Sequence, residues 1–187
     1  MRKIGALILS MMILFSGCGN KEKNIETLDV SDPDNFMDCL AEIISEKDSD
    51  RLYDFFSEET QQYDLKLFEE TQEFVDCFKG DYVSYSLLYS ESSEHTRPDE
   101  DAKYKESILA AYEVNTTEGN YKVCFIYYNE TPQRTYLGLQ TLGVQILDES
   151  ETETFMCSDI HGCYVVTPDN HDELIARRDY DIEHSNW

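Results

Sequence analysis

The first third of the chain carries apolar residues at the spacing that lines one face of a helix. Asp32 and Pro33 provide a cap and a first-turn proline for a helix that begins at Pro33. Asp48 caps a second, short helix. A third helix is predicted over about 64–78, with Gly80 as its stop. The pattern therefore predicts three helices ahead of any strand.

After Gly80 the period of the apolar residues changes from that of a helix to two, which is typical of half-buried strands. Four strands are predicted, over about 82–89, 107–115, 121–128 and 135–147. Residues 117–120 form a hairpin turn between the second and third strands. The polar stretch 90–105 is expected to be a long loop. Residues 162–166 are apolar and are expected to form a final strand or docked segment.

Helices that are followed by a run of antiparallel strands indicate the α+β class. We expect the three N-terminal helices to pack on a curved antiparallel sheet of four or more strands, in one domain over residues 33–166. A parallel sheet is not expected. Residues 167–187 are charged and are expected to form an acidic, loosely held C-terminal tail.

The N-terminus has the pattern of an export signal over residues 1–17, in which Arg2 and Lys3 precede an apolar run. That run is shorter than the roughly 20 residues that a membrane-spanning helix needs. Residues 18–32 are polar and are expected to form a flexible tether.

The residues around the expected cleavage site, Leu14-Phe15-Ser16-Gly17-Cys18, resemble the lipobox of bacterial lipoproteins. The resemblance implies that Cys18 receives diacylglycerol on its sulfur and becomes the first residue after cleavage. It further implies a protein that is anchored to the cell membrane by lipid, on the extracytoplasmic face.

The chain has 187 residues, with 15 basic and 39 acidic side chains and a formal net charge of −24. Nucleic-acid binding requires Lys and Arg to neutralise phosphates, so no nucleic-acid partner is expected. The acidic surface also repels anionic lipid headgroups. The membrane is therefore a partner through the lipid anchor and not through a basic patch.

The order of helices and strands resembles the cystatin-like fold typified by nuclear transport factor two. The segments Phe78–Tyr85, Tyr121–Tyr128 and Leu137–Leu139 resemble a family of uncharacterised lipoproteins of low-GC Gram-positive bacteria, the domain of unknown function numbered 5104. The resemblance covers about residues 35–166 and brings no functional residues with it. In the wider superfamily the sheet and helices enclose a cone-shaped pocket, which some members use for catalysis and others for binding or dimerisation.

Aromatic residues on the predicted apolar strand faces are the candidates for lining such a pocket: Tyr85, Tyr112, Phe125 and Tyr127. Their rings would stack on a ligand and their hydroxyls would donate hydrogen bonds. Aromatic residues are also favoured in strands for packing alone, so filling of the core is the alternative. No pair of acidic and basic side chains for catalysis is evident in the sequence, and no catalytic residue is assigned.

Four residues with metal-binding side chains alternate near the C-terminus: Cys157, Asp159, His161 and Cys163. An extended strand would spread them over about 20 Å, whereas structural zinc is held by ligands that converge from two separated turns. We therefore expect no metal and no other cofactor. A disulfide between Cys157 and Cys163 is an alternative for this segment.

The remaining cysteines lie on predicted apolar faces. Cys39 and Cys77 belong to predicted helices and Cys124 to a predicted strand, where buried thiols act as small hydrophobic side chains. With Cys18 committed to lipid, five cysteines remain, so at least one thiol stays unpaired.

Together these observations favour an extracytoplasmic, membrane-anchored binding or interaction module without catalytic activity. Two alternatives stay open. The first is a small-molecule carrier or enzyme that uses the cone-shaped pocket. The second is a scaffold that forms a homodimer through its sheet. The sequence does not identify the protein or small molecule that would be the partner.

Overall fold

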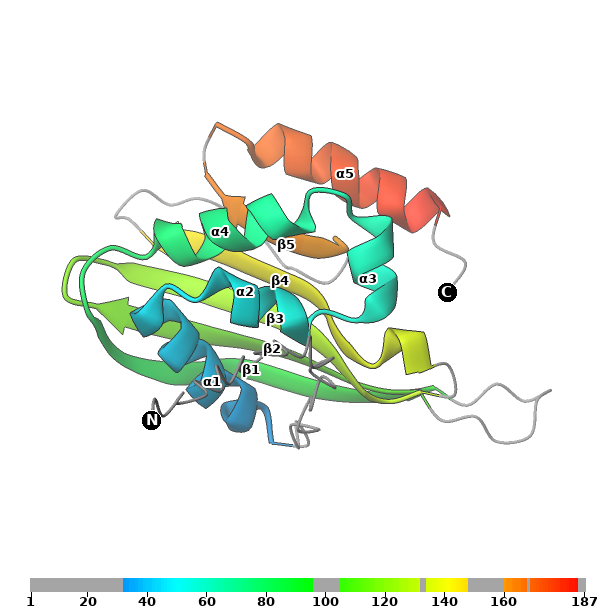
Figure 1. Cartoon of the computed structure of the whole chain (residues 1–187), viewed down its shortest axis with the longest axis horizontal. Coiled ribbons are helices and arrows are strands. Elements are labelled where there is room, and N and C mark those ends of the chain that lie inside the picture. The colour runs from blue at the N-terminus through cyan, green and yellow to red at the C-terminus, as the bar shows by residue number, and fades with distance from the viewer. Residues whose placement is uncertain (1–31, 96–104, 132–133, 148–159, 168, 185–187) are drawn as a thin grey trace, which may run out of the picture.

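A computed structural model describes residues 32–95, 105–131, 134–147, 160–167 and 169–184 (Figure 1). Four helices come first: α1 (Pro33–Glu46), α2 (Ser49–Phe55), α3 (Glu58–Tyr63) and α4 (Leu67–Cys77). They are followed by β1 (Tyr82–His95), β2 (Lys105–Thr116), β3 (Asn120–Glu130), a 3-10 turn η1 (Arg134–Tyr136), β4 (Gly138–Leu147), β5 (Gly162–Val166) and α5 (His171–His184).

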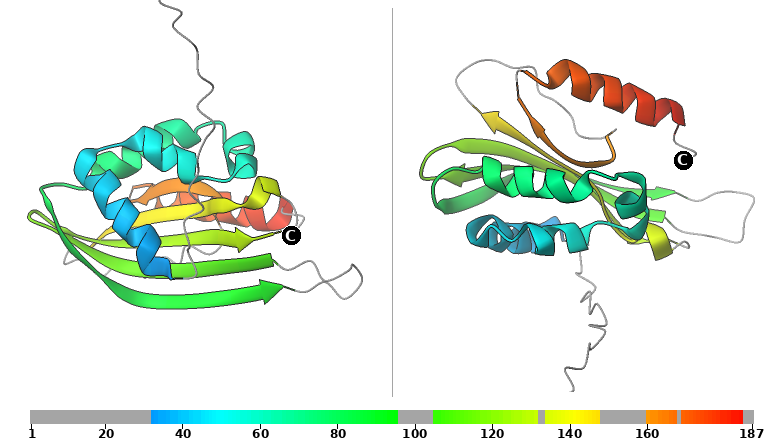
Figure 2. Two further views of the ribbon diagram at one scale, coloured as in Figure 1. Left: turned by 60° about the horizontal axis from the view of Figure 1, so that its bottom comes forward. Right: turned by 45° about the horizontal axis from the view of Figure 1, so that its top comes forward.

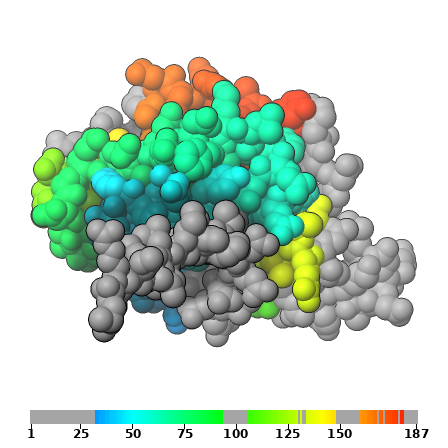
Figure 3. Space-filling view, in the orientation of Figure 1, coloured from blue at the N-terminus to red at the C-terminus, as the bar shows by residue number. Residues whose placement is uncertain are grey.

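One five-stranded sheet runs in the order β1-β2-β3-β4-β5. Strands β1 to β4 pair with one another in antiparallel fashion, and β5 pairs in parallel with β4. Helices α1 to α4 cover one face of the curved sheet, and α5 lies on the other face beside β5 (Figures 1 and 2). The space-filling view shows α3 and α4 in front of the sheet, with α5 at the upper rim (Figure 3). The α+β class is confirmed, but the sheet is mixed and not purely antiparallel.

Short polar side chains begin the first two helices as predicted. The side chain of Asp32 accepts from the Asp34 N–H at the start of α1, and that of Asp48 accepts from the Arg51 N–H in α2. Lys47 ends α1 in the left-handed region, with φ 56°, and its Nζ donates to the carbonyl of Phe78 at 2.8 Å. This last bond ties the turn between α1 and α2 to the end of α4.

The helical region contains four helices, so the prediction of three is wrong. The additional helix, α3, begins after Ser57, whose side chain accepts from the Thr60 N–H. The predicted third helix over 64–78 corresponds to α4, which starts at Leu67. Residues 90–95, which we expected in a loop, continue β1.

The main core fills the space between α1–α4 and the sheet. The side chains of Phe36 from α1 and Phe74 from α4 are completely buried there, against alternate residues of the central strands. The strand residues of this core are Ile108, Ala110, Tyr112, Val114, Tyr121, Val123, Phe125, Tyr127, Leu139, Leu142, Val144 and Cys163. Burial of these side chains is the main stabilising contribution to the fold.

A second, smaller core lies on the opposite face, beneath α5. Leu174 of α5 packs with Tyr164 of β5 and Cys124 of β3. The ring of Tyr164 lies over Gly143, where a Cβ would come within 2.4 Å of the ring. The segment that we expected to be a loosely held tail from residue 167 thus contains a helix that packs on the sheet. Among the described helices, none is long and apolar enough to cross a membrane.

The cysteines divide between free and bonded. Cys39, Cys77 and Cys163 carry free thiols. Cys124 is disulfide-bonded, so it is not the simple buried thiol that we expected, and its partner lies outside the described residues. The free thiol of Cys163 also contradicts the alternative of a bond to Cys157.

Candidate functional site

The four aromatic residues that we predicted as pocket lining lie together, and none of them lines the cavity that is described below. The Phe36 ring from α1 fills the space, with its centroid 4.6 Å from that of Phe125. Tyr112 stacks on Phe125 at 6.1 Å and meets Tyr85 edge-on at 5.5 Å. Tyr112 and Phe125 are completely buried, and Tyr127 is 6% exposed. These residues form part of the main core.

Two of these tyrosines carry their hydroxyls to the surface of α1. Tyr112 donates to Asp34 at 2.7 Å, and Tyr85 donates to Asp38 at 2.7 Å. Burial and then the bond to Asp34 raise the pKa of Tyr112 well above its usual range. The hydroxyl therefore stays protonated at neutral pH, as a donor that fixes α1 on the sheet.

The candidate metal ligands do not form a site in the described part of the chain. Two of the candidates, Cys157 and Asp159, lie outside the described residues. The predicted lipidation site, Cys18, also lies outside them, as do all of residues 1–31. Burial raises the pKa of the Cys163 thiol well above its usual value, so the thiol stays protonated. Within the described ranges, no group of three His, Cys, Asp or Glu side chains is placed to hold a metal ion.

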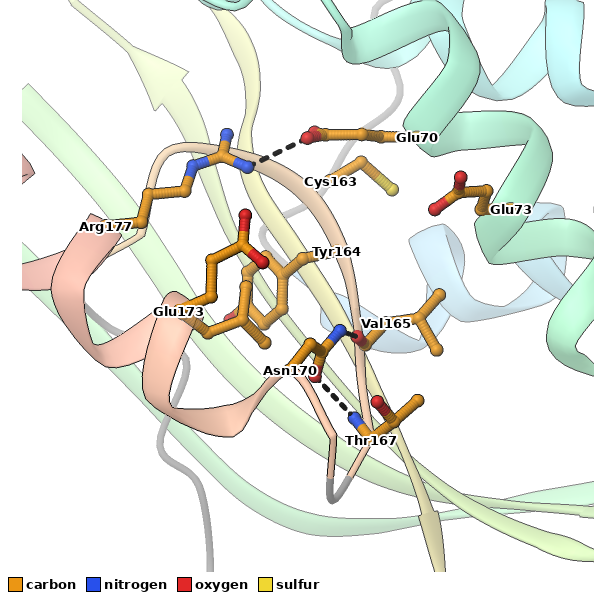
Figure 4. Close-up of a pocket in the computed structure, with 10 residues that line it drawn as sticks. Glu70, Glu73, Cys163, Tyr164, Val165, Thr167, Asn170, Glu173 and Arg177 are labelled. Atoms are coloured by element: carbon orange, nitrogen blue, oxygen red, sulfur yellow. Dashed lines mark hydrogen bonds and ion pairs between the residues drawn. The ribbon is translucent and has the colours of Figure 1, made fainter.

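A cavity of about 400 Å³ lies beside β5, between α4 and α5 (Figure 4). We call it the β5 groove. The residues that line it are Glu70, Glu73, Cys163, Tyr164, Val165, Thr167, Asn170, Glu173, Leu174 and Arg177. Its volume lies within the range of small-ligand pockets.

The walls of the β5 groove are acidic. Glu70 and Glu73 extend from α4 on one side, and Glu173 extends from α5 on the other (Figure 4). The single cation among the lining residues, Arg177, is already neutralised by carboxylates. A positively charged group in the groove would therefore meet complementary charge.

Arg177 joins α5 to α4 across the end of β5. Its guanidinium donates to Asp64 Oδ2 at 2.7 Å, to Glu70 Oε1 at 2.9 Å and to the carbonyl of His161 at 2.6 Å. Its side chain is 25% exposed, and that of Asp64 is 8% exposed. We call Arg177, Asp64 and Glu70 the Arg177 clamp.

The Arg177 clamp requires a glycine next to it. Gly162 has a φ of +100°, which L-residues rarely adopt. A Cβ at this position would lie 2.3 Å from Asp64 Oδ2 and 2.7 Å from Arg177 Nη2. The absent side chain leaves room for the ion pair at the start of β5.

Glu70 is the most perturbed carboxyl of the groove. Burial, followed by the nearby Asp64 carboxyl, raises the pKa of Glu70 to about 7 in spite of its bond to Arg177. Its second carboxylate oxygen, Oε2, is buried without a hydrogen-bond partner among the described residues.

The comparisons with known proteins bear on part of this site. A family model described as a domain of unknown function, DUF5104, matches residues 40–153. The chain belongs to the DUF5104 family. A search of curated proteins finds no match. The span matched to DUF5104 includes α4 with Glu70 and Glu73, whereas β5 and α5 lie C-terminal to it.

Sequence reasoning did not find the β5 groove. Glu70, Glu73 and Glu173 stand in acidic segments where most carboxylates are solvated, and the two walls are about a hundred residues apart in the sequence. The sequence does contain a pattern that indicates α5, because Asn170 is followed by the apolar pair Leu174 and Ile175. That pattern predicts a capped helix with one buried face.

Proposed function

We propose that the chain is a lipid-anchored, extracytoplasmic binding module that holds a cationic group of its ligand in the β5 groove. The observation that carries the proposal is the cavity itself, with the side chains of Glu70, Glu73 and Glu173 around it. We propose no catalytic step, because the one thiol that lines the groove, that of Cys163, is kept protonated by burial.

The lipobox-like sequence at Cys18 supports the anchor and the extracytoplasmic location. Diacylglycerol on Cys18 would hold the protein at the membrane, and the acidic domain would stand away from anionic headgroups. We also propose a cystatin-like fold, which is supported by the helices packed on one face of an antiparallel meander, β1 to β4. In that fold the cone-shaped space is the expected ligand site, but Phe36 fills it here.

The proposal is tested by calorimetric titration of the purified full chain, in a non-ionic detergent, with the blocked peptide acetyl-Lys-Lys-Lys-amide. Acetyl-Gln-Gln-Gln-amide is the uncharged control ligand. We expect the lysine peptide to bind and the glutamine peptide not to bind. The double variant Glu73→Gln/Glu173→Gln should weaken binding by about tenfold. Each of the two carboxylates should contribute about half of the corresponding binding free energy.

The matched control is Glu69→Gln, which removes an exposed carboxylate of the same helix that does not line the groove. Its affinity should equal that of the unchanged chain. Equal weakening by Glu69→Gln and by the groove variants would mean that the peptide only senses the net charge. That result would contradict the proposed site.

A second candidate function, a homodimer formed through the sheet, is favoured by the exposed strand β1. This 14-residue strand is at the edge of the sheet, and four of its apolar residues are about half exposed: Val83 at 58%, Leu87 at 51%, Leu88 at 52% and Tyr89 at 45%. A long apolar edge is a template for pairing with another chain.

The homodimer is tested by sedimentation of the full chain over a hundredfold range of concentration. A dimer formed through β1 should dissociate on dilution, and Leu87→Lys should shift the chain to monomer. A monomer at every concentration would contradict this second candidate and leave the β5 groove unaffected.

A further inference from the structure

The second core beneath α5 contains a covalently bonded cysteine. Cys124 of β3 is disulfide-bonded, and it is 7% exposed within this core. The chain has six cysteines, and three of those that the structure describes carry free thiols: Cys39, Cys77 and Cys163. Two cysteines therefore remain as candidate partners of Cys124, namely Cys18 and Cys157.

The strand register brings the start of β5 close to Cys124. Cys124 pairs with Gly143 of β4, and Ile126, on the same face of β3, pairs with Thr141. The Thr141 hydroxyl donates to the carbonyl of Ile160 at 2.7 Å. Ile160 is 1% exposed and belongs to the same core as Cys124. Since neighbouring strands lie about 4.8 Å apart, Ile160 is roughly 10 Å from β3, two strands away.

Cys157 is within reach of Cys124 from this point. It lies outside the described residues, and it precedes Ile160 by three residues. Three residues of extended chain span about 10 Å. A disulfide requires Cα atoms that are about 4.4–6.8 Å apart. The chain before Ile160 is therefore long enough to bring Cys157 to the position that the bond requires.

Cys18 is the less suitable partner. It precedes Asp32, the first described residue, by 14 residues, so nothing in the described fold holds it near β3. Its lipobox-like sequence also commits its sulfur to diacylglycerol. A sulfur that carries diacylglycerol has no thiol hydrogen to lose and cannot form a disulfide.

We infer that Cys124 and Cys157 form a disulfide that ties β3 to the chain just before β5. The two thiols lose two protons and two electrons to a disulfide-bearing oxidant, which leaves as a dithiol, and one sulfur–sulfur bond forms. The bond joins residues 33 positions apart and closes a loop that includes β4. Such bonds persist in oxidising compartments, so the pairing supports the extracytoplasmic location in the proposed function.

The inference is tested by peptide mapping of the full chain, which is expressed with its N-terminal signal and purified without reductant. Free thiols are alkylated in denaturant, and the chain is cleaved with trypsin and at Asp159, so that Cys157 and Cys163 fall in different peptides. We expect the Cys124 peptide to be linked to the Cys157 peptide. A link to Cys18 would overturn the inference and the lipid anchor together. Alkylated Cys124, or a link to Cys163, would overturn the inference alone.

Thermal unfolding provides a second measurement. Cys124→Ala and Cys157→Ala should each lower the unfolding midpoint by about 10 °C, because each removes the same bond. The double variant should lower the midpoint no further. The control is Cys39→Ala, which removes a free thiol, so that dithiothreitol should still lower its midpoint. Additive losses in the double variant, or an unchanged chain that does not respond to dithiothreitol, would overturn the inference.

Discussion

The interior beneath α1 and the β5 groove differ in what fills them, although both place carboxylates next to hydrogen-bond donors. Beneath α1, the Phe36 ring occupies the space between the helix and the sheet. At the margin of this space, Asp34 and Asp38 accept hydrogen bonds from tyrosine hydroxyls. In the β5 groove, Arg177 holds the two walls together while a cavity remains between them. In this protein the aromatic side chains of the strands pack the core, and the cavity lies where the Arg177 clamp holds α4 and α5 in place.

The largest effect is expected from removing the side chain that fills the interior. Phe36→Ala should lower the free energy of unfolding by about 3–5 kcal/mol, because a fully buried ring is lost and a cavity remains. Urea denaturation measures this change. Phe68→Ala, at a site that is 43% exposed, is the control and should cost much less. A loss below about 1 kcal/mol for Phe36→Ala would mean that the interior is not filled as described.

The next effect should come from breaking the Arg177 clamp. Arg177→Met removes the partner of two largely buried carboxylates, Asp64 and Glu70, and should lower the free energy of unfolding by about 3 kcal/mol. Hydrogen exchange in α5 should also become faster. The control is Arg51→Met, which breaks an exposed pair with Glu42 and should cost less than about 1 kcal/mol. Equal costs for the two variants would contradict the clamp.

A third effect follows from the pKa of Glu70, which is about 7 in the folded chain. Its ionised fraction rises from about one-tenth at pH 6 to about nine-tenths at pH 8. If a cationic ligand requires the ionised form, affinity for acetyl-Lys-Lys-Lys-amide should rise up to about ninefold over this range. Calorimetry at the two pH values measures the change. Glu70→Gln should give an affinity that does not change between them.

Glu70 also makes the stability of the fold depend on pH. This effect has the opposite direction to its effect on ligand affinity. Between about pH 4.5 and 7, folded Glu70 retains a proton that the unfolded chain has released. Its contribution to the free energy of unfolding therefore decreases as the pH rises through this window. A contribution that increases instead would show that the ion pair with Arg177 dominates over burial.

The smallest effect is expected at the margin of the filled interior. Tyr112→Phe removes the hydrogen bond to Asp34 and keeps the ring, so it should cost about 1 kcal/mol. A double-mutant cycle with Asp34→Ala isolates the energy of this pair from the packing of the ring. A coupling energy of zero would show that the hydroxyl does not fix α1 on the sheet.

Local patterns predicted most of the elements. The caps at Asp32 and Asp48 and the apolar spacing that follows them located α1 and α2. Alternation located the four antiparallel strands, although β1 and β2 extend further into residues 90–105 than the polar composition suggested. These signals depend on residues that are close in the sequence.

The elements that were missed depend on distant contacts. Helix α3 is six residues long and has one buried residue, Thr60, so it has almost no apolar period. Helix α5 is highly charged, and contacts with Asp64 and Glu70, more than a hundred residues earlier, help to hold it. The β5 groove needs α4, α5 and the unusual φ of Gly162, so no single segment of the sequence indicates it.

The most direct test of the β5 groove is a two-dimensional ¹⁵N NMR titration of the full chain with acetyl-Lys-Lys-Lys-amide. We expect the chemical-shift changes to concentrate in β5, at Cys163 to Val165, and in α5 from Asn170 to Arg177. Changes centred on Tyr112, Phe125 and Tyr127 would place the ligand in the interior beneath α1. That result, or changes scattered over the acidic surface, would show that the β5 groove is not the binding site.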